Sequence, residues 1–283
     1  VIGVFIIDDS ALVRQILGEL ITAAPDMRLL GTAPDPVVAR AALEKAWPDV
    51  FLLDLEMPRQ DGLSFLRQLM SERPTPVVVF AAGTEQGSAL CLEALAAGAI
   101  EVIAKPALGV RDFLRDAQRT LWASLRAAAA AAPRRSVPVH AVVPARAQPH
   151  LTQLIAIGAS TGGVQALEFL LTALNPDSPP LAIVQHMPAA YTGAFARRLN
   201  GLCPLTVKEA ETGDRLVPGV ALIAPGGRHL ELSASALGWV AQLTDAPPVN
   251  RHCPSVDVLF HALARHASRN LTGVLLTGMG EDG

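Results

Sequence analysis

The sequence predicts an α/β protein built from two doubly wound parallel-sheet domains. Its 283 residues are 51% hydrophobic, which is enough chain for two separate cores. In both halves, short apolar runs alternate with longer segments of helical period, a pattern typical of parallel sheets covered by helices. A proline-rich stretch, residues 133–149, separates the two halves.

Five apolar runs of strand length organise the first half. Each is followed by a longer segment whose apolar residues have helical spacing, so we expect one parallel sheet with helices on both faces. The expected strands are Ile2–Ile7, Leu29–Ala33, Val50–Leu53, Val77–Phe80 and Ala99–Ile103.

Charged residues follow three of these strands, at the edge where parallel sheets gather their chemistry. Asp8 and Asp9 follow the first strand, Asp54 the third and Lys105 the fifth. Three carboxylates at one edge repel each other unless a hard cation neutralises them, so Mg²⁺ is the expected metal. Lys105 would place a compact positive charge beside an acyl phosphate. The alternative is that Asp8 and Asp9 cap the next helix and Lys105 is a solvated loop charge.

Three segments of the first half carry a family resemblance: IIDDSALVRQIL, LLDLEMPRQDGLSFL and GAIEVIAKP. They resemble the receiver domain of two-component response regulators, which has a flavodoxin-like fold. The resemblance covers nearly all of residues 1–120. It implies that Asp54 is the phosphoacceptor and that Lys105 contacts the phosphoryl group. It also implies that Mg²⁺ is held by Asp8, Asp9, Asp54 and the main-chain carbonyl of Glu56.

Two positions depart from the receiver pattern. The serine or threonine that follows the phosphoryl group in this family corresponds to Ala81, and the nearby aromatic switch residue corresponds to Val102. Thr84 lies three residues after Ala81 and is not at the matching position. We therefore expect phosphorylation to occur but to be transmitted weakly.

The junction between the halves changes from helix to linker. Residues 111–131 combine helix-period leucines with a run of alanines, and the prolines that follow favour an extended chain. The expected organisation is a receiver domain at 1–120, a helix end and Pro/Ala-rich linker at 121–152, and a second domain at 153–283.

The second half again alternates apolar runs with helical segments, and a hairpin is expected near Leu230–Leu243. The sequence predicts a second α/β sheet from these strands: Leu154–Ile157, Leu181–Val184, Val220–Ile223 and Val274–Leu276.

A serine among very small residues ends the first of these strands, in IAIGASTGG from Ile155 to Gly163. A serine at such a strand-to-helix turn is raised above the sheet edge, where helix N–H groups can stabilise an oxyanion. A phosphate or dinucleotide loop is the competing interpretation, but the GxxxGG spacing does not match GxGxxG. Ser160 is therefore a candidate nucleophile.

A base and an acid must accompany such a nucleophile. His186 ends the next strand, in LAIVQHMP, and is the preferred base, with His229 and His252 as alternatives. Asp282 follows the last predicted strand and is the preferred acid, with Glu281 as its rival.

Five segments of the second half carry a family resemblance: IAIGASTGG, VQHMPAAYTGAFARRLN, APGGRHLEL, PPVNRHCPSVDVLF and LLTGMGEDG. They resemble the Rossmann-like catalytic domain of chemotaxis protein-glutamate methylesterases, over residues 153–283. The resemblance implies a Ser160 nucleophile, a His186 base oriented by Asp282, and main-chain oxyanion donors at Thr161 and Met279. Because members of this family continue beyond the glycine-rich acid loop, we expect further strands and helices beyond Gly283.

The resemblance also implies a substrate and partners. The substrates would be glutamate methyl esters and glutamines on the cytoplasmic helices of methylated chemoreceptors, with a chemotaxis histidine kinase as phosphodonor. The competing hypothesis is a phosphorylation-controlled interaction protein with an inactive esterase domain, which Ala81 and Val102 favour.

Charge and cysteine usage exclude several other classes. The net charge of -3, without a basic tract, disfavours a nucleic-acid partner, and three scattered cysteines indicate neither a disulfide framework nor a zinc site. Without an apolar run of about 18 residues or a secretory signal, we expect a cytoplasmic protein with no direct membrane insertion.

Overall fold

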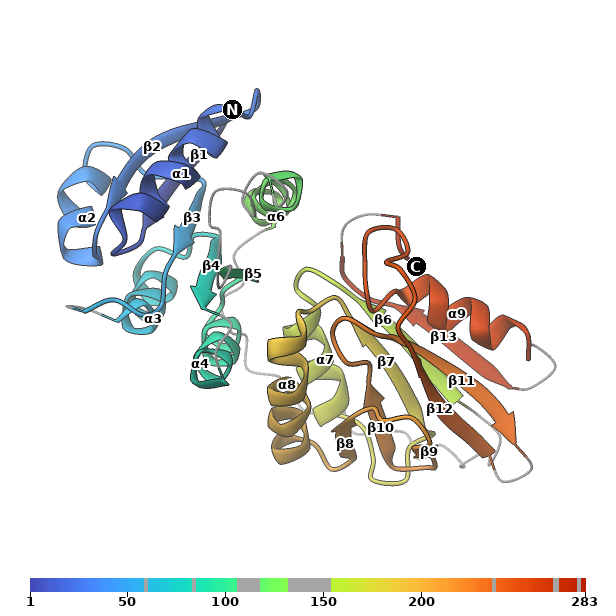
Figure 1. The fold of residues 1–283 in the computed structure, drawn as a ribbon. Coiled ribbons are helices and arrows are strands. Elements are labelled where there is room, and N and C mark those ends of the chain that lie inside the picture. Colours follow the sequence, from blue (N-terminus) through green and yellow to red (C-terminus); the bar gives the residue numbers. More distant parts are fainter. Residues whose placement is uncertain are drawn as a thin grey trace. The chain divides into compact units, whose positions relative to one another are not determined.

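Each half of the chain is built around a five-stranded parallel sheet. The computed structural model describes residues 1–58, 61–82, 85–105, 118–131, 154–235, 238–266, 270–278 and 281–283. It divides into two compact units, Val1–Pro138 and Val139–Gly283. Figure 1 shows the strands and helices of each unit.

The first sheet has the order β2-β1-β3-β4-β5, and all its neighbours are parallel. Central strands β1 and β3 are apolar almost throughout, as strands covered on both faces require. The strands are β1 (Ile2–Ile7), β2 (Met27–Ala33), β3 (Val50–Leu53), β4 (Val77–Ala82) and β5 (Glu101–Lys105).

Helices cover both faces of this sheet. They are α1 (Ala11–Thr22), α2 (Pro36–Leu43), α3 (Gly62–Glu72), α4 (Glu85–Ala96) and α6 (Gln118–Ala130). Helices α1 and α6 share one core with alternate residues of β1, β3 and β4, including Leu17 and Leu125. On the opposite face, the ring of Phe51 on β3 meets two other rings edge to edge, those of Phe5 on β1 and Phe65 on α3.

The second sheet has the order β13-β6-β7-β10-β8 and is also parallel. Its strands are β6 (Leu154–Ala159), β7 (Leu181–Gln185), β8 (Thr206–Glu209), β10 (Val220–Ile223) and β13 (Leu271–Leu275). Strands β6 and β7 lie side by side at its centre, which places Ser160 and His186, the residues that follow them, at one edge.

Two layers enclose the second sheet (Figure 1). Helices α7 (Gly163–Thr172) and α8 (Ala189–Leu202) lie on one face. Helix α9 (Val256–Ala264) and an antiparallel sheet β11-β12-β9 lie on the other, where Leu230, Trp239 and Leu259 join the core. The antiparallel strands are β9 (Arg215–Leu216), β11 (His229–Ser235) and β12 (Gly238–Thr244).

The predicted fold class is confirmed, and several strands differ in detail from their predicted bounds. Strand β5 begins two residues later than expected, because Gly98 (φ 113°) and the bond from Ala99 N–H to the Ala94 carbonyl extend the preceding turn. Strand β13 begins three residues earlier than its apolar run, because Thr272 and Gly273 pair in register with β6. Strand β8 was not predicted, since TVKE has no apolar run.

Helix α6 packs on the first unit, although the predicted receiver ended at residue 120. Most of the expected linker at 121–152, including its proline-rich residues 133–149, lies outside the described residues, so the predicted domain bounds stay predictions. Among the described residues, no helix is long and apolar enough to cross a bilayer.

Candidate functional sites

The turn from β6 to α7 holds Ser160 above the edge of the second sheet. Its N–H donates to the Thr277 carbonyl at 2.9 Å, and its carbonyl accepts from Gly163 N–H at 2.7 Å. Gly162 takes a left-handed conformation (φ 77°), which a side chain would strain. The serine is therefore fixed by backbone contacts on both sides.

Close packing explains the small residues around this serine. A Cβ on Gly163 would lie 2.0 Å from Gln185 Oε1, and a Cβ on Gly158 would lie 2.4 Å from a Val256 methyl group. The Gln185 side-chain amide donates to the carbonyls of Ser160 and His186, at 2.9 and 3.1 Å. Glycine thus lets Gln185 tie the two strand ends together.

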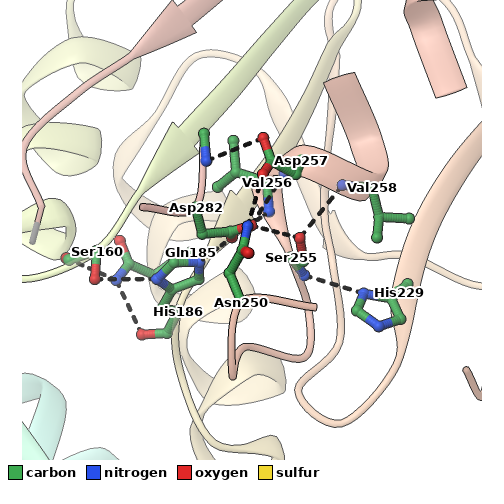
Figure 2. Close-up of polar contacts among 11 residues, drawn as sticks. Ser160, Gln185, His186, His229, Asn250, Ser255, Val256, Asp257, Val258 and Asp282 are labelled. Atoms are coloured by element: carbon green, nitrogen blue, oxygen red, sulfur yellow. Dashed lines mark hydrogen bonds and ion pairs between the residues drawn. The ribbon is translucent and has the colours of Figure 1, made fainter. Parts of the chain in front are cut away.

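His186 lies between Ser160 and Asp282 (Figure 2). Its Nδ1 is 3.1 Å from Ser160 Oγ, and its Nε2 is 2.7 Å from Asp282 Oδ2. An ionised carboxylate only accepts hydrogen bonds, so Nε2 carries the proton of the neutral ring. Nδ1 is then free to accept the Ser160 hydroxyl proton, which is the geometry that a general base needs.

The Asp282 carboxylate is anchored at the N-terminus of α9. It accepts from the Ser255 hydroxyl (2.6 Å) and from the Val256 and Asp257 N–H groups (2.7 and 3.3 Å). The Asn250 side chain adds a fourth bond at 3.2 Å. Burial opposes the charge of Asp282, but these donors and His186 outweigh it and hold the pKa of this carboxyl below its usual range.

The alternative acid–base residues occupy other positions. His229 is fully buried, accepts from Ser255 N–H at 3.1 Å and lies 3.1 Å from the Pro247 carbonyl, so it supports the loop before α9. His252 contacts the ring of His186 rather than the serine. Glu281 is exposed, whereas the Asp282 side chain is 1% exposed and contacts His186.

Ser255, Asn250 and Gln185 were not singled out as site residues from the sequence. Ser255 carried one usable signal, because a serine before the apolar run of α9 is a typical N-cap, and it does cap Val258 N–H. Gln185 and Asn250 had no comparable pattern.

The oxyanion donors stay predictions. Thr161 lies in the turn directly before α7, and its carbonyl accepts from the Thr277 hydroxyl at 2.9 Å. Met279 lies outside the described residues.

The acidic pocket of the first unit forms where β1, β3 and β5 end. Ligand oxygens of Asp8, Asp9 and Asp54 lie within 4.8 Å of one another. Lys105 donates to Asp54 Oδ2 at 2.6 Å and pairs with Asp8 Oδ2 at 2.8 Å. Asp8 and Asp54 are 1% and 3% exposed. The predicted carboxylates and lysine therefore lie together, and the alternative of a solvated Lys105 is wrong.

The electrostatics of this pocket suit a divalent cation. Burial raises the pKa of Asp8, an effect that Lys105 offsets only in part. Burial alone would lower the pKa of Lys105, but Asp54 and Asp8 raise it above its ordinary value. Asp8 Oδ2 is buried, and its ion pair with Lys105 at 2.8 Å leaves further acceptor positions on the oxygen. Closely spaced carboxylate oxygens with spare acceptor capacity are the ligands that Mg²⁺ prefers.

The two departures from the receiver pattern lie on the neighbouring strands β4 and β5. Ala81, 1% exposed, pairs in register with Ala104 on β5, one residue before Lys105. Val102 is half-buried on the same strand. Glu56 donates its N–H to Asp54 Oδ1 at 3.2 Å, and the metal-binding role of its carbonyl stays a prediction. Thr84 lies outside the described residues.

Together, the two units define a class of protein. A doubly wound domain with an acidic pocket and a lysine is joined to an α/β domain that carries a serine, a histidine and a carboxylate in contact. This is the arrangement of a response regulator whose output domain is a hydrolase.

Comparisons with known proteins give the family. Residues 4–114 match the response regulator receiver domain family, and residues 155–283 match the CheB methylesterase family. The chain is 48% identical to protein-glutamate methylesterase/protein-glutamine glutaminase 1 of Chromobacterium violaceum, over 100% of this chain and 84% of that protein. It is 51% identical to the protein of the same name from Cupriavidus metallidurans, over 100% and 81%. The chain belongs to the protein-glutamate methylesterase/protein-glutamine glutaminase family.

A solved structure is also similar. The Thermotoga maritima CheB methylesterase catalytic domain is 38% identical, covers 47% of this chain and 70% of its own, and has a TM-score of 0.45.

Proposed function

We propose that this protein removes methyl groups from glutamate methyl esters on the cytoplasmic helices of chemoreceptors and deamidates receptor glutamines. Phosphorylation of Asp54 by a chemotaxis histidine kinase would regulate the reaction, which takes place in the cytoplasm. Family membership supports the activity, and the continuous contact from Ser160 through His186 to Asp282 carries the mechanism.

Acylation begins when Ser160 Oγ attacks the ester carbonyl and its proton passes to His186 Nδ1, 3.1 Å away. The resulting imidazolium is stabilised by Asp282, whose hydrogen bonds keep it ionised. His186 then protonates the departing methoxide, so methanol leaves and the glutamyl group remains on Ser160.

Deacylation reverses these roles. A water molecule gives its proton to His186 and attacks the acyl-enzyme, and His186 returns the proton to Ser160 Oγ as glutamate leaves. With a glutamine substrate, ammonia replaces methanol as the leaving group. The main-chain N–H groups of Thr161 and Met279 are the proposed donors to the oxyanion in both steps.

In the receiver unit, Asp54 is the proposed phosphoacceptor and Lys105 the residue that contacts the phosphoryl group. Mg²⁺ held by Asp8, Asp9, Asp54 and the Glu56 carbonyl would neutralise charge as the phosphoryl donor approaches. The ion pairs of Lys105 with Asp54 and Asp8 support the same role for its ammonium.

Replacing the nucleophile tests the esterase proposal. We expect Ser160→Ala in the full-length protein to lower methanol release from methylated receptor membranes by at least about a thousandfold, because loss of a nucleophile removes the covalent step. Thermal unfolding should change little. Ser233→Ala, an exposed serine on β11, is the matched control and should retain wild-type activity. Activity above about a tenth of wild type in Ser160→Ala would contradict the proposal.

A further inference from the structure

A second histidine lies flat against the proposed base. The rings of His186 and His252 are stacked with their centroids 3.8 Å apart and their planes 3° from parallel. His186 is therefore held at its edge by Ser160 and Asp282 and on one face by His252.

The loop that carries His252 is fixed by its backbone. Val249 and His252 exchange two main-chain hydrogen bonds, at 2.8 and 3.1 Å. Asn250 and Arg251 between them take left-handed conformations, φ 49° and 69°, which cost energy for residues other than glycine. Such strain persists only where surrounding contacts over-determine the loop, and the Asn250 side chain supplies two of them, to Asp257 and Asp282.

No hydrogen bond from the described residues holds the ring nitrogens of His252. Its ring is instead positioned by the backbone of the loop and by contact with His186. An aromatic ring of similar shape could therefore replace it without leaving a buried polar partner unsatisfied.

The charge of His252 matters because His186 becomes cationic in the proposed reaction. A neutral ring can lie against an imidazolium, since aromatic faces carry negative charge density, whereas two imidazolium rings at 3.8 Å repel. Three charged or titratable groups act on His252. Burial, His186 and Arg251 lower the pKa of His252, and Asp282 opposes them. The net shift is downward, so the ring stays neutral until the solution becomes acidic.

We propose that His252 is a positioning residue, whose uncharged ring holds the imidazole of His186 in line between Ser160 and Asp282. This inference rests on the proposed role of His186 as the base. It adds one requirement to a nucleophile, a base and an acid. A second ring must lie against the base, and this ring must stay neutral.

Two variants separate the ring from its charge. His252→Ala removes the stacking face, and His252→Phe keeps a flat ring that cannot be protonated. His266→Phe is the matched control, because His266 also contacts an aromatic ring, Trp239 at 5.4 Å, but not His186. Methanol release from methylated receptor membranes is measured for each full-length protein as kcat and KM across the pH range, with thermal unfolding as a check on folding.

We expect His252→Ala to lower kcat by about 10- to 100-fold with KM nearly unchanged, because a misplaced base costs rate rather than binding. His252→Phe should keep most of the wild-type kcat near neutral pH. Its rate should fall in acid with a slope of one, as the site takes up a single proton. The slope for wild type should steepen toward two, because His252 also gains a proton and becomes charged. His266→Phe should match wild type throughout.

A wild-type kcat in His252→Ala, or an acid limb in His252→Phe that coincides with that of wild type, would overturn the inference. The activity of Ser160→Ala distinguishes failure of this inference from failure of the proposed function. If that variant retained activity, the mechanism at this site would be wrong. If it lost activity while His252→Ala did not, only the role of His252 would be wrong.

Discussion

The Asp282 carboxylate accepts hydrogen bonds from five groups, and one of them is His186. The other four come from the loop before α9 and from its first turn, so Asp282 is held in place whether or not His186 is charged. At the scale of single residues, the orientation of His186 thus depends on a helix terminus that contributes no reacting atom.

Asp282→Asn tests this dependence. The asparagine amide would meet the Nε2 proton of His186 or force the other tautomer, in which Nδ1 cannot accept from Ser160. We expect kcat to fall by about 10³- to 10⁴-fold, a loss typical of triads with the wrong tautomer. Asp257→Asn, whose carboxylate accepts from Asn250 and Gly283, is the control and should stay within a few-fold of wild type. Equal losses in both variants would show that the loop, not the tautomer, is responsible.

Asp54 allows a second prediction for a single residue. Its crowded, buried carboxylate can accept a phosphoryl group only if a cation offsets the charge of the pocket, so labelling by a small-molecule phosphodonor should require Mg²⁺. Asp54→Asn should remain unlabelled. Asp61→Asn should be labelled normally, because asparagine also caps α3. Labelling of wild type in excess chelator would count against the metal site.

At the scale of elements, the β6–α7 turn joins the serine to the neighbouring strand. Gln185 at the end of β7 binds the carbonyls of Ser160 and His186, and its amide fits against α7 only because Gly163 has no side chain. The position of the nucleophile relative to the base is therefore a property of two adjacent strand ends and one helix start.

Gly163→Ala should disturb this arrangement. The new methyl group must displace Gln185, so we expect a loss of about 1–3 kcal/mol in the free energy of unfolding and a reduced kcat. Gly201→Ala in α8 meets nothing within 4 Å and should be neutral or stabilising by up to about 1 kcal/mol. Urea unfolding and methanol release of the two variants provide the comparison. The packing argument fails if Gly163→Ala is as stable and as active as Gly201→Ala.

At the scale of the whole molecule, phosphorylation in one unit must alter a reaction in the other. An equilibrium shifts only by the free energy that distinguishes its two states. Ala81, buried at the end of β4 beside the strand that carries Lys105, has no hydroxyl to bind a phosphoryl oxygen. We therefore expect this receiver to lack part of the free-energy difference that phosphorylation supplies in its family.

Ala81→Thr should restore part of the response. We expect beryllofluoride to activate methanol release weakly in wild type and by up to about tenfold more in Ala81→Thr, since a hydrogen bond to a charged group contributes about 1.5 kcal/mol. Ala81→Val has the same shape without the hydroxyl and should behave like wild type. An equal gain in the valine variant would assign the effect to packing.

The sequence alone determined the two parallel sheets and most of their strands. Parallel strands end at a common edge, so residues that directly follow apolar runs could be assigned to one site before any contact was known. This is why Asp8, Asp54 and Lys105 were predicted together, and why Ser160 and His186 were paired. The structure brings both sets together, while their chemical roles stay predictions.

Only the tertiary structure decided how these groups are held. The anchoring of Asp282 on α9, the stacking of His252 on His186 and the Gln185 contacts join segments far apart in the chain. Such contacts leave no local periodicity, because they depend on how helices and loops pack over the sheet rather than on the order of residues within one element. The sequence therefore indicated which residues meet, and the packing of distant segments decided their orientation and tautomer.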